Sequence, residues 1–267
     1  MASTVGRYWW RAMAALEPWD PTPSIAARRS FDPAPAAVLL VYRHANAANV
    51  KALCDAAASD TIFRMWALDR VHPDLERWTV GEGAGMRSPL LDKLYGTLPA
   101  NYEGYVVLSD DDYVFTGGDL STFLSVARAA GIGLAQPGHD RLSRTSHWVT
   151  AARRLSLVRL TSFVEIGPLV AVAPEWRERV LPLDDEGMGW GVDLAWSDLR
   201  AEGCRLGVVD STLIRHLFPV VGGGSYEVAE ARQQMEALYE KRGGYHHALR
   251  TVATWWPWRP RPPWIRR

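Results

Sequence analysis

Tyr-Val-Val-Leu-Ser-Asp-Asp-Asp occupies residues 105–112, and the fold can be worked out from this stretch. Its first five residues form a short run rich in β-branched and aromatic side chains, which is typical of a buried strand. Three carboxylates follow without a spacer. Adjacent carboxylates at the end of a buried strand repel one another and are costly to desolvate. A bound cation removes both difficulties, so the stretch predicts a strand that ends at a cation site.

On the N-terminal side of this stretch, short apolar runs alternate with helical segments. Residues 38–42 and 62–67 predict two strands, and residues 49–58 between them predict a helix. Strand, helix and strand at this spacing indicate a parallel βαβ unit. A glycine-rich loop over residues 81–85 then leads into a predicted helix over residues 88–98.

On the C-terminal side the alternation continues with shorter elements. Apolar patterns predict strands or extended segments over residues 133–136, 164–172 and 206–209, the last ending at Asp210-Ser211. The predicted helices cover residues 120–130, 175–180, 192–201 and 227–241. The pattern predicts an α/β fold in which a mixed, mostly parallel sheet carries helices on both faces. Ligands of such sheets bind beyond the carboxyl ends of the strands, so Tyr42-Arg43, Asp69 and Asp110 are expected around one crevice.

Length and composition limit the classes of protein that this chain can be. Its 267 residues, 48% hydrophobic and 22% charged, fit one large domain with appendages. We expect an N-terminal arm over residues 1–36, a catalytic domain over residues 37–226, and a C-terminal helix and Trp/Arg/Pro-rich tail over residues 227–267. The 30 basic and 30 acidic residues balance, which argues against nucleic acid as a partner.

Cysteine usage and hydropathy bear on the compartment. Cys54 and Cys204 lie in apolar surroundings and are expected to be buried thiols in a reducing environment. The sequence carries no signal-peptide pattern and no apolar run long enough to cross a membrane. These features predict a cytoplasmic protein.

The triplet Asp110-Asp111-Asp112 also predicts the chemistry of the cation. Carboxylate oxygens suit Mg²⁺ or Mn²⁺, which commonly take phosphate oxygens from a substrate as well. On an extended backbone Asp110 and Asp112 point one way, while Asp111 turns toward a backbone group, a ribose or an arginine. His216 is a candidate third ligand through a neutral imidazole. The alternatives are a solvated acidic turn for the triplet and an ordinary loop position for His216.

Taken together, these motifs resemble GT-A-type glycosyltransferases, and among them the family catalogued as domain of unknown function 707. The resemblance covers about residues 37–224 and depends on the order and spacing of short motifs. The sequence departs from that family at Ser109 and Asp111, where tryptophan and glutamate are usual. The motifs are Asp110-Asp111-Asp112, Gln136-Pro137, Phe163-Val164-Glu165, Gly189-Trp190-Gly191-Val192-Asp193, Val208-Val209-Asp210-Ser211 and His216 followed by Gly222-Gly223.

The resemblance implies a nucleoside-diphosphate sugar as donor, with the diphosphate as leaving group. Mn²⁺ or Mg²⁺ held by Asp110, Asp112 and His216 would neutralise the charge that develops on that diphosphate. Arg87 would add a charge-assisted contact to the phosphates, the alternative being an arginine on the surface.

Residues at other strand ends would hold the nucleoside of the donor. Tyr42 and Arg43, at the end of the first strand, would frame the base. Asp69, at the end of the second, would accept a hydrogen bond from base or ribose, or else cap a turn. Asp111 is also counted among the expected donor contacts.

The segment from Gly187 to Trp196 is expected to bind the acceptor, a saccharide or another hydroxyl compound. It resembles the Trp-Gly-x-Asp/Glu segment of inverting GT-A enzymes, so the transfer is expected to invert configuration. An acceptor hydroxyl must lose its proton as it attacks, which makes Asp193 the candidate catalytic base and Glu165 its rival. Trp190 would stack on a sugar ring. The alternatives are a helix N-cap for Asp193 and core packing for Trp190.

The sequence leaves two other classes of function open. A sugar-nucleotide hydrolase would use the same acidic site with water in place of the acceptor. A non-catalytic carbohydrate-binding protein would use the 13 tryptophans for stacking. The polar stretch between Pro137 and Thr161 is either a lid over the donor or a surface loop.

The tail from Arg242 to Arg267 interleaves tryptophan with arginine. It either lies on an anionic membrane, at the inner face, or packs on the body or on a second subunit as a homodimer contact.

Overall fold

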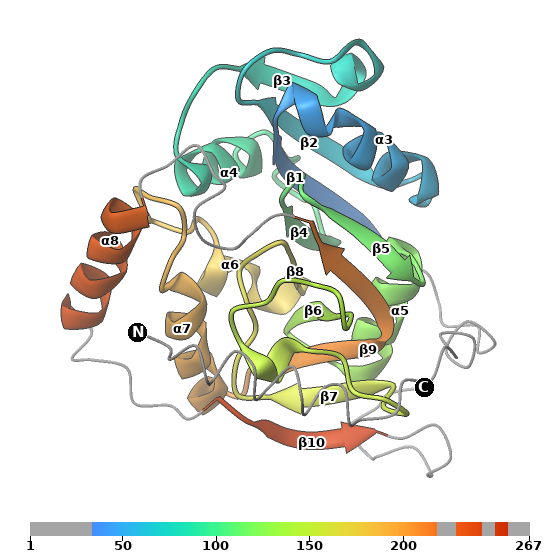
Figure 1. Cartoon of the computed structure of the whole chain (residues 1–267), viewed down its shortest axis with the longest axis vertical. Coiled ribbons are helices and arrows are strands. Elements are labelled where there is room, and N and C mark those ends of the chain that lie inside the picture. The colour runs from blue at the N-terminus through green and yellow to red at the C-terminus, as the bar shows by residue number, and fades with distance from the viewer. Residues whose placement is uncertain (1–33, 218–227, 242–248, 256–267) are drawn as a thin grey trace.

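A computed structural model describes residues 34–217, 228–241 and 249–255, and there the chain forms one large sheet covered by helices (Figure 1). The strands are β1 (Ala36–Tyr42), β2 (Ile62–Ala67), β3 (Thr79–Glu82), β4 (Tyr105–Ser109), β5 (Tyr113–Gly117), β6 (Leu134–His139), β7 (Val158–Thr161), β8 (Leu169–Val172), β9 (Leu206–His216) and β10 (Thr251–Trp255). Their order across the sheet is β10-β7-β9-β6-β8-β4-β1-β2-β3, and β5 pairs with β9.

Most strands of the sheet run in one direction. β1 pairs in parallel with β2 and with β4, and β2 pairs in parallel with β3. β8 lies antiparallel between β4 and β6, and β6 pairs in parallel with β9. The carboxyl ends of β1, β2, β4, β6 and β9 therefore lie at one edge of the sheet. The predicted mixed, mostly parallel α/β sheet is confirmed.

Helices cover both faces of this sheet, as predicted. α3 and α5 pack in one apolar cluster, and α4, α6 and α7 pack in a second. Successive residues of β1 point to opposite faces of the sheet, so Leu40 joins the first cluster and Leu39 the second. The α-helices are α3 (Ala47–Ala56), α4 (Arg87–Tyr95), α5 (Leu120–Ala130), α6 (Arg177–Val180), α7 (Val192–Trp196) and α8 (Val228–Lys241). The 3-10 turns are η1 (His44–Asn46), η2 (Pro73–Trp78), η3 (Trp148–Thr150), η4 (Pro174–Trp176) and η5 (Ser197–Glu202).

The elements with a clear apolar period lie where the sequence predicts them. β2, β4 and α5 match their predicted bounds, and β1, α3 and α4 differ from theirs by up to three residues. α5 shows why: the Asp119 side chain accepts a hydrogen bond from the Thr122 N–H at 2.7 Å, and Gly131 ends the helix with a left-handed φ of 62°.

β9 is longer than predicted. It does not end at Val209 but continues to His216, through a bulge in its pairing with β6 after Val209. Asp210 is tolerated inside the sheet because Arg159 donates to both of its carboxylate oxygens, at 2.7 and 2.9 Å, and both side chains are fully buried. His216 is therefore the last residue of a strand and not part of a loop.

Other predicted bounds are also corrected. The extended stretch predicted over residues 164–172 is a strand only from Leu169, and the helix predicted over residues 192–201 splits into α7 and η5. β6 continues three residues beyond Gln136 to His139.

The C-terminal part of the chain packs on the rest where it is described. β10 pairs antiparallel with β7, so residues 251–255 belong to the sheet although the sequence places them in a tail outside the catalytic domain. α8 lies beside α7 (Figure 1) and contacts Gly187 and Gly191. The predicted arm up to residue 33, and the tail residues 242–248 and 256–267, lie outside the described residues.

Two further features can be compared with the sequence. Cys54 and Cys204 are buried and unpaired, as predicted, and burial raises the pKa of each thiol to about 12. In the described ranges, every helix is too short or too polar to cross a bilayer.

Candidate active site

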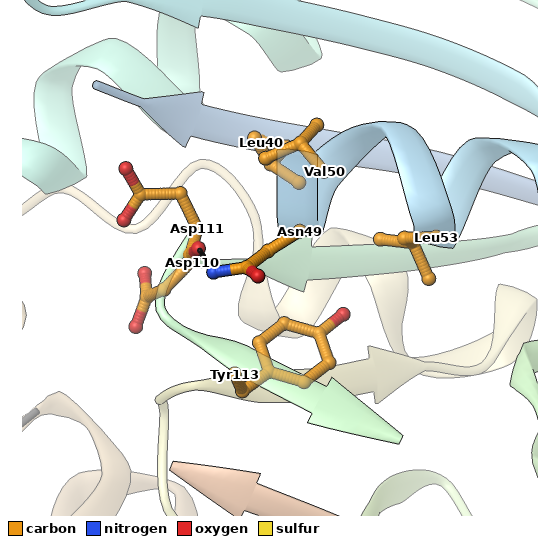
Figure 2. A pocket seen from close by; sticks show the side chains of 7 residues that line it. All are labelled: Leu40, Asn49, Val50, Leu53, Asp110, Asp111 and Tyr113. Atoms are coloured by element: carbon orange, nitrogen blue, oxygen red, sulfur yellow. Dashed lines mark hydrogen bonds between the residues drawn. The ribbon is translucent and has the colours of Figure 1, made fainter. Parts of the chain in front are cut away.

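The acidic triplet lies just beyond β4, at the edge where the parallel strands end. Figure 2 shows Asp110 and Asp111 at this strand end, with Asn49 of α3 pointing toward them and Tyr113 nearby. Asn49 Nδ2 donates to the Asp111 carbonyl at 3.4 Å. The space between these side chains measures about 10 Å³, room for a single water. This pocket is therefore too small to hold a nucleotide.

Asp111 joins β4 to the end of β1. Its Oδ2 accepts a hydrogen bond from the Arg43 backbone N–H at 2.6 Å, and its Oδ1 lies 3.8 Å from the Arg43 Nη1. Burial raises the pKa of Asp111 to about 6, although both contacts with Arg43 act to lower it. The side chain thus faces a backbone group and an arginine.

Asp110 is paired with Arg87, the first residue of α4. Arg87 Nε donates to Asp110 Oδ1 at 2.5 Å, and Arg87 Nη2 donates to the Ile166 carbonyl at 3.1 Å. Burial raises the pKa of Asp110, and the charge of Arg87 opposes that rise. Arg87 is itself buried, and its Nη1 finds no hydrogen-bond partner among the residues that the structure describes. Arg87 is therefore not a surface arginine, and one of its donor groups has no hydrogen-bond partner among the described residues.

Asp112 faces His216 at the end of β9. The His216 Nε2 lies 2.9 Å from the Asp112 Oδ2. The His216 Nδ1 lies 3.2 Å from the Arg144 carbonyl, which can only accept, so Nδ1 carries a proton. Because Nε2 and the Asp112 oxygen would otherwise be two acceptors facing each other, their contact needs either a second proton on Nε2 or a cation bound by both. The Asp112 Oδ1 is buried and has no hydrogen-bond partner within the described ranges. This strand end therefore holds two groups side by side: the buried Asp112 Oδ1, which has no partner in the described residues, and the His216 imidazole, which the Arg144 carbonyl orients.

These residues fit a divalent cation that also takes ligands from a substrate. Across residues 34–217, 228–241 and 249–255, no group of three or more His, Cys, Asp or Glu is arranged to hold a metal ion. Mg²⁺ usually binds through one or two protein carboxylates together with waters and substrate phosphates. Asp112 and His216 supply donors of the kind that Mn²⁺ and Mg²⁺ accept. Asp110 is engaged by Arg87, and its role as a ligand stays a prediction.

Two residues expected to hold the nucleoside serve local structure. Tyr42 is fully buried, with its hydroxyl 3.0 Å from the Thr79 Oγ1 and 3.2 Å from the backbone nitrogen of His72, so it presents no surface to a base. Asp69 accepts hydrogen bonds from the N–H groups of His44 and of its own neighbour, at 2.9 and 2.7 Å. Although the slight burial acts to raise it, these bonds lower the pKa of Asp69. Asp69 therefore closes the turn between the ends of β1 and β2.

Asp193 is a buried carboxyl in the first turn of α7. The N-cap of this helix is Gly191, so the alternative of Asp193 as N-cap is wrong. Asp193 Oδ2 accepts from the Ile166 N–H at 3.4 Å, and Oδ1 accepts from the following amide at 2.9 Å. Burial raises the pKa of Asp193 to about 6, while His147 lowers it and Glu165 raises it. A carboxyl that titrates close to neutrality is suited to proton removal.

Glu165, the rival base, is enclosed by hydrogen-bond donors. Its Oε1 accepts from the Thr145 hydroxyl at 3.1 Å, from the His147 N–H at 3.0 Å and from the His147 Nδ1 at 2.9 Å. Its Oε2 lies 3.0 Å from the His139 Nε2. Burial alone would raise the pKa of Glu165, but the two histidines hold it well below its usual range. Glu165 is therefore a fixed carboxylate.

Sequence reasoning missed His139 and His147. His139 ends β6 at the same edge as the acidic triplet, and extending the predicted strand past Pro137 would have found it. His147 gives no local signal, because nothing near it in sequence shows that its loop returns to Glu165. That loop is packed and not simply exposed: the Ser143 hydroxyl accepts from the His216 N–H at 2.9 Å.

The predicted acceptor segment is a tight glycine turn under α8. Gly189 and Gly191 have φ values of 86° and 91°, which favour glycine, and Trp190 between them is half-buried. A Cβ at Gly191 would lie 3.2 Å from side-chain atoms of Met235 and Tyr239 on α8. Side chains of α8 therefore cover this turn.

The backbone of Ile166 and Gly167 joins the two halves of the site. The Ile166 carbonyl accepts from Arg87, and the Ile166 N–H donates to Asp193. A Cβ on Gly167 would lie 2.7 Å from the Asp110 Oδ2, so this close approach requires glycine. The acidic strand end and the Asp193 region are therefore both fixed to the same short backbone segment.

The fold is the GT-A-like nucleotide-diphospho-sugar transferase fold. No family model and no curated protein matches the sequence, so nothing supports the narrower resemblance to domain of unknown function 707. Among solved structures, that of GalNAc-T7 with UDP, GalNAc and Mn²⁺ is similar, with a TM-score of 0.51 and 9% sequence identity. The likeness covers 85% of this chain and 55% of that one, so this chain spans about half the length of the other.

Proposed function

We propose that this protein is a divalent-metal-dependent glycosyltransferase that moves a sugar from a nucleoside diphosphate to a hydroxyl acceptor. The observation that carries the proposal is the Asp112–His216 pair, with its unpaired buried oxygen, at the carboxyl edge of a GT-A-like sheet. Sugar nucleotides carry the diphosphate that a cation at this edge would bind.

On the donor side, Asp112 and His216 would hold Mn²⁺ or Mg²⁺, and the bound cation would supply charge neutralisation for the diphosphate. Arg87 has its Nη1 free to donate to a phosphate oxygen or a sugar hydroxyl. Asp110 orients the guanidinium of Arg87 through the 2.5 Å contact with its Nε, whether or not it also reaches the cation.

On the acceptor side, Asp193 is the base. The acceptor oxygen forms a bond to the anomeric carbon as the bond to the diphosphate breaks, and the hydroxyl proton passes to a carboxylate oxygen of Asp193. Attack assisted by a base on the acceptor, with no covalent sugar–enzyme intermediate, inverts configuration. Trp190 supplies an aromatic face for a saccharide acceptor.

The test is a thermal-unfolding panel of the full chain with UDP, GDP and their sugar conjugates, each with and without Mn²⁺. We expect one nucleotide class to raise the melting temperature only when the metal is present. If neither class stabilises the protein with Mn²⁺ or Mg²⁺, the donor assignment fails. A donor that stabilises the protein equally well without metal would contradict the role of Asp112 and His216.

A further inference from the structure

His216, the last residue of β9, is held through both its ring and its backbone. Its Nε2 lies 2.9 Å from the Asp112 Oδ2, and its Nδ1 lies 3.2 Å from the Arg144 carbonyl oxygen. Its backbone N–H donates to the Ser143 hydroxyl oxygen at 2.9 Å. The N–H of the next residue, Leu217, donates to the Asp112 carbonyl at 2.8 Å. Two neighbouring residues of the loop after β6, Ser143 and Arg144, therefore fix the backbone and the ring of this candidate ligand.

The turn that carries Ser143 is tied to β9 by hydrogen bonds of Asp140. The Asp140 N–H donates to the Ile214 carbonyl at 2.8 Å, and the Arg215 guanidinium donates to the Asp140 Oδ2 at 2.6 and 2.9 Å. Asp140 also closes the turn itself. Its Oδ1 accepts from the Leu142 N–H at 2.9 Å, and its carbonyl accepts from the Ser143 N–H at 3.0 Å. Ser143 is therefore placed against the end of the strand before any ligand binds.

A second histidine fixes the hydroxyl of Ser143. Ser143 is buried, and its Oγ lies 2.8 Å from the Nδ1 of His139. His139 is 1% exposed, and its Nε2 lies 3.0 Å from the Glu165 Oε2. A hydroxyl oxygen has one proton and two lone pairs, so it accepts from the His216 N–H while it shares a hydrogen bond with His139 in either direction. The contacts thus run from Glu165 through His139 and Ser143 to His216.

We propose that Ser143 is a positioning residue for the cation site: its hydroxyl, fixed by His139, holds the end of β9 so that the His216 imidazole faces Asp112. The role of His216 as a cation ligand rests on the proposed function, whereas the contacts that hold His216 do not. The Ser143 oxygen is already engaged by His139 and by the His216 N–H, so Ser143 acts through His216 and not as a ligand. Hydrogen bonds that orient metal-binding residues from behind typically change metal affinity by about 10- to 100-fold when they are removed.

The experiment measures Mn²⁺ binding to the full chain by electron paramagnetic resonance, with Mn²⁺ alone and with Mn²⁺ plus UDP or GDP. The signal of free Mn²⁺ gives the affinity, and spin-echo modulation by a histidine nitrogen reports an imidazole on the bound metal. We expect this nitrogen modulation in the wild type and its loss in His216→Gln. In Ser143→Ala we expect the Mn²⁺ affinity to fall by at least ~10-fold and the nitrogen modulation to weaken.

Two further variants make this result specific. Ser143→Cys keeps nearly the volume of serine, but its sulfur is a weak acceptor, so it should lower the affinity in the same direction. It also replaces Ser143→Ala if that variant does not fold. Ser146→Ala removes an exposed hydroxyl from the same loop and is the matched control, which should bind Mn²⁺ as the wild type does.

The outcomes separate this proposal from the proposed function. Wild-type protein that binds Mn²⁺ through a histidine nitrogen, with Ser143 variants that match it in affinity and modulation, would overturn the role of Ser143 alone. An equal loss in Ser146→Ala and Ser143→Ala would do the same. Wild-type protein that binds no Mn²⁺, or binds it without a histidine nitrogen, would overturn both the cation site at His216 and the role of Ser143.

Discussion

Arg87 and Asp193 hold opposite ends of one residue: the Arg87 Nη2 lies 3.1 Å from the Ile166 carbonyl oxygen, and the Asp193 Oδ2 lies 3.4 Å from the Ile166 nitrogen. The proposed donor contact and the proposed base are therefore fixed to the same short segment. This segment also passes close to Asp110, which is paired with Arg87. A change at Arg87 should consequently be felt on both sides of the site.

Replacing Arg87 with methionine leaves the half-buried carboxylate of Asp110 without its partner. We expect Arg87→Met to lower the free energy of unfolding by about 2 kcal/mol, because a part-buried carboxylate that loses its partner costs less than a fully buried one. The double variant Arg87→Met/Asp110→Asn removes both charges and should recover more than half of that loss. Urea unfolding of the wild type, Arg87→Met, Asp110→Asn and the double variant measures the energetic coupling between Arg87 and Asp110. Losses that simply add would show that the two side chains do not depend on each other.

The Asp112–His216 pair should control the effect of metal on nucleotide binding. Asp112→Asn and His216→Gln keep the shape of each side chain and weaken its donation to a cation. We expect each to reduce the Mn²⁺-dependent gain in nucleotide affinity by at least ~10-fold, measured by calorimetry with the nucleotide that stabilises the wild type. Asp60→Asn, at an exposed carboxylate, serves as the control. Retention of the full metal effect in both site variants would remove this pair from the cation site.

The sequence predicts those elements whose apolar pattern and whose start and stop residues indicate the same helix or strand. β1, β2, β4 and α5 are short-range patterns, and each needs only its own residues to be recognised. The carboxyl edge follows from their order, which is why the triplet at 110–112 can be placed there without a structure.

What the sequence does not reveal depends on contacts between distant residues. β9 reaches His216 because Arg159, 51 residues from Asp210 in the chain, neutralises that carboxylate inside the sheet. The Arg87–Asp110 and His147–Glu165 pairs join residues 23 and 18 positions apart. β5 and β7 carry mixed polar and apolar residues, and what makes each of them a strand is its pairing with β9. Local propensity carries none of this information.

A substitution at Gly191 tests whether α8 packs against the turn that precedes Asp193. Gly191→Ala combines a left-handed φ of 91° with a Cβ 3.2 Å from Met235, whereas Gly203→Ala has a φ of 97° and open space around its Cβ. Backbone strain alone costs about 1–2 kcal/mol at either position. We therefore expect Gly191→Ala to lose more stability in urea than Gly203→Ala, and Met235→Ala to restore part of the difference. Equal losses would mean that α8 does not press on this turn.

The pH dependence of stability provides a test that needs no ligand. The folded state raises the pKa of Asp111 and Asp193 to about 6, mainly through burial, and raises those of His147 and His216 through their carboxylate partners, against the effect of burial. Each group binds protons more readily when folded, so its contribution to stability is largest at low pH and is lost as pH rises through the folded pKa. Glu165 has the opposite sign, but its effect lies below the pKa of about 4.5 that it has when unfolded.

Unfolding of the metal-free protein in urea should therefore require more denaturant at pH 5.5 than at pH 8. Each of the two aspartates accounts for roughly 1 kcal/mol over this interval, because most of the range between its unfolded and folded pKa lies below pH 5.5. Asp193→Asn cannot ionise, so its free energy of unfolding should change less between pH 5.5 and pH 8 than that of the wild type. Asp60→Asn should show the same change with pH as the wild type. A stability that rises with pH between 5.5 and 8 would mean that these carboxyls are not buried in the folded protein, and the environment assigned to Asp193 would then be wrong.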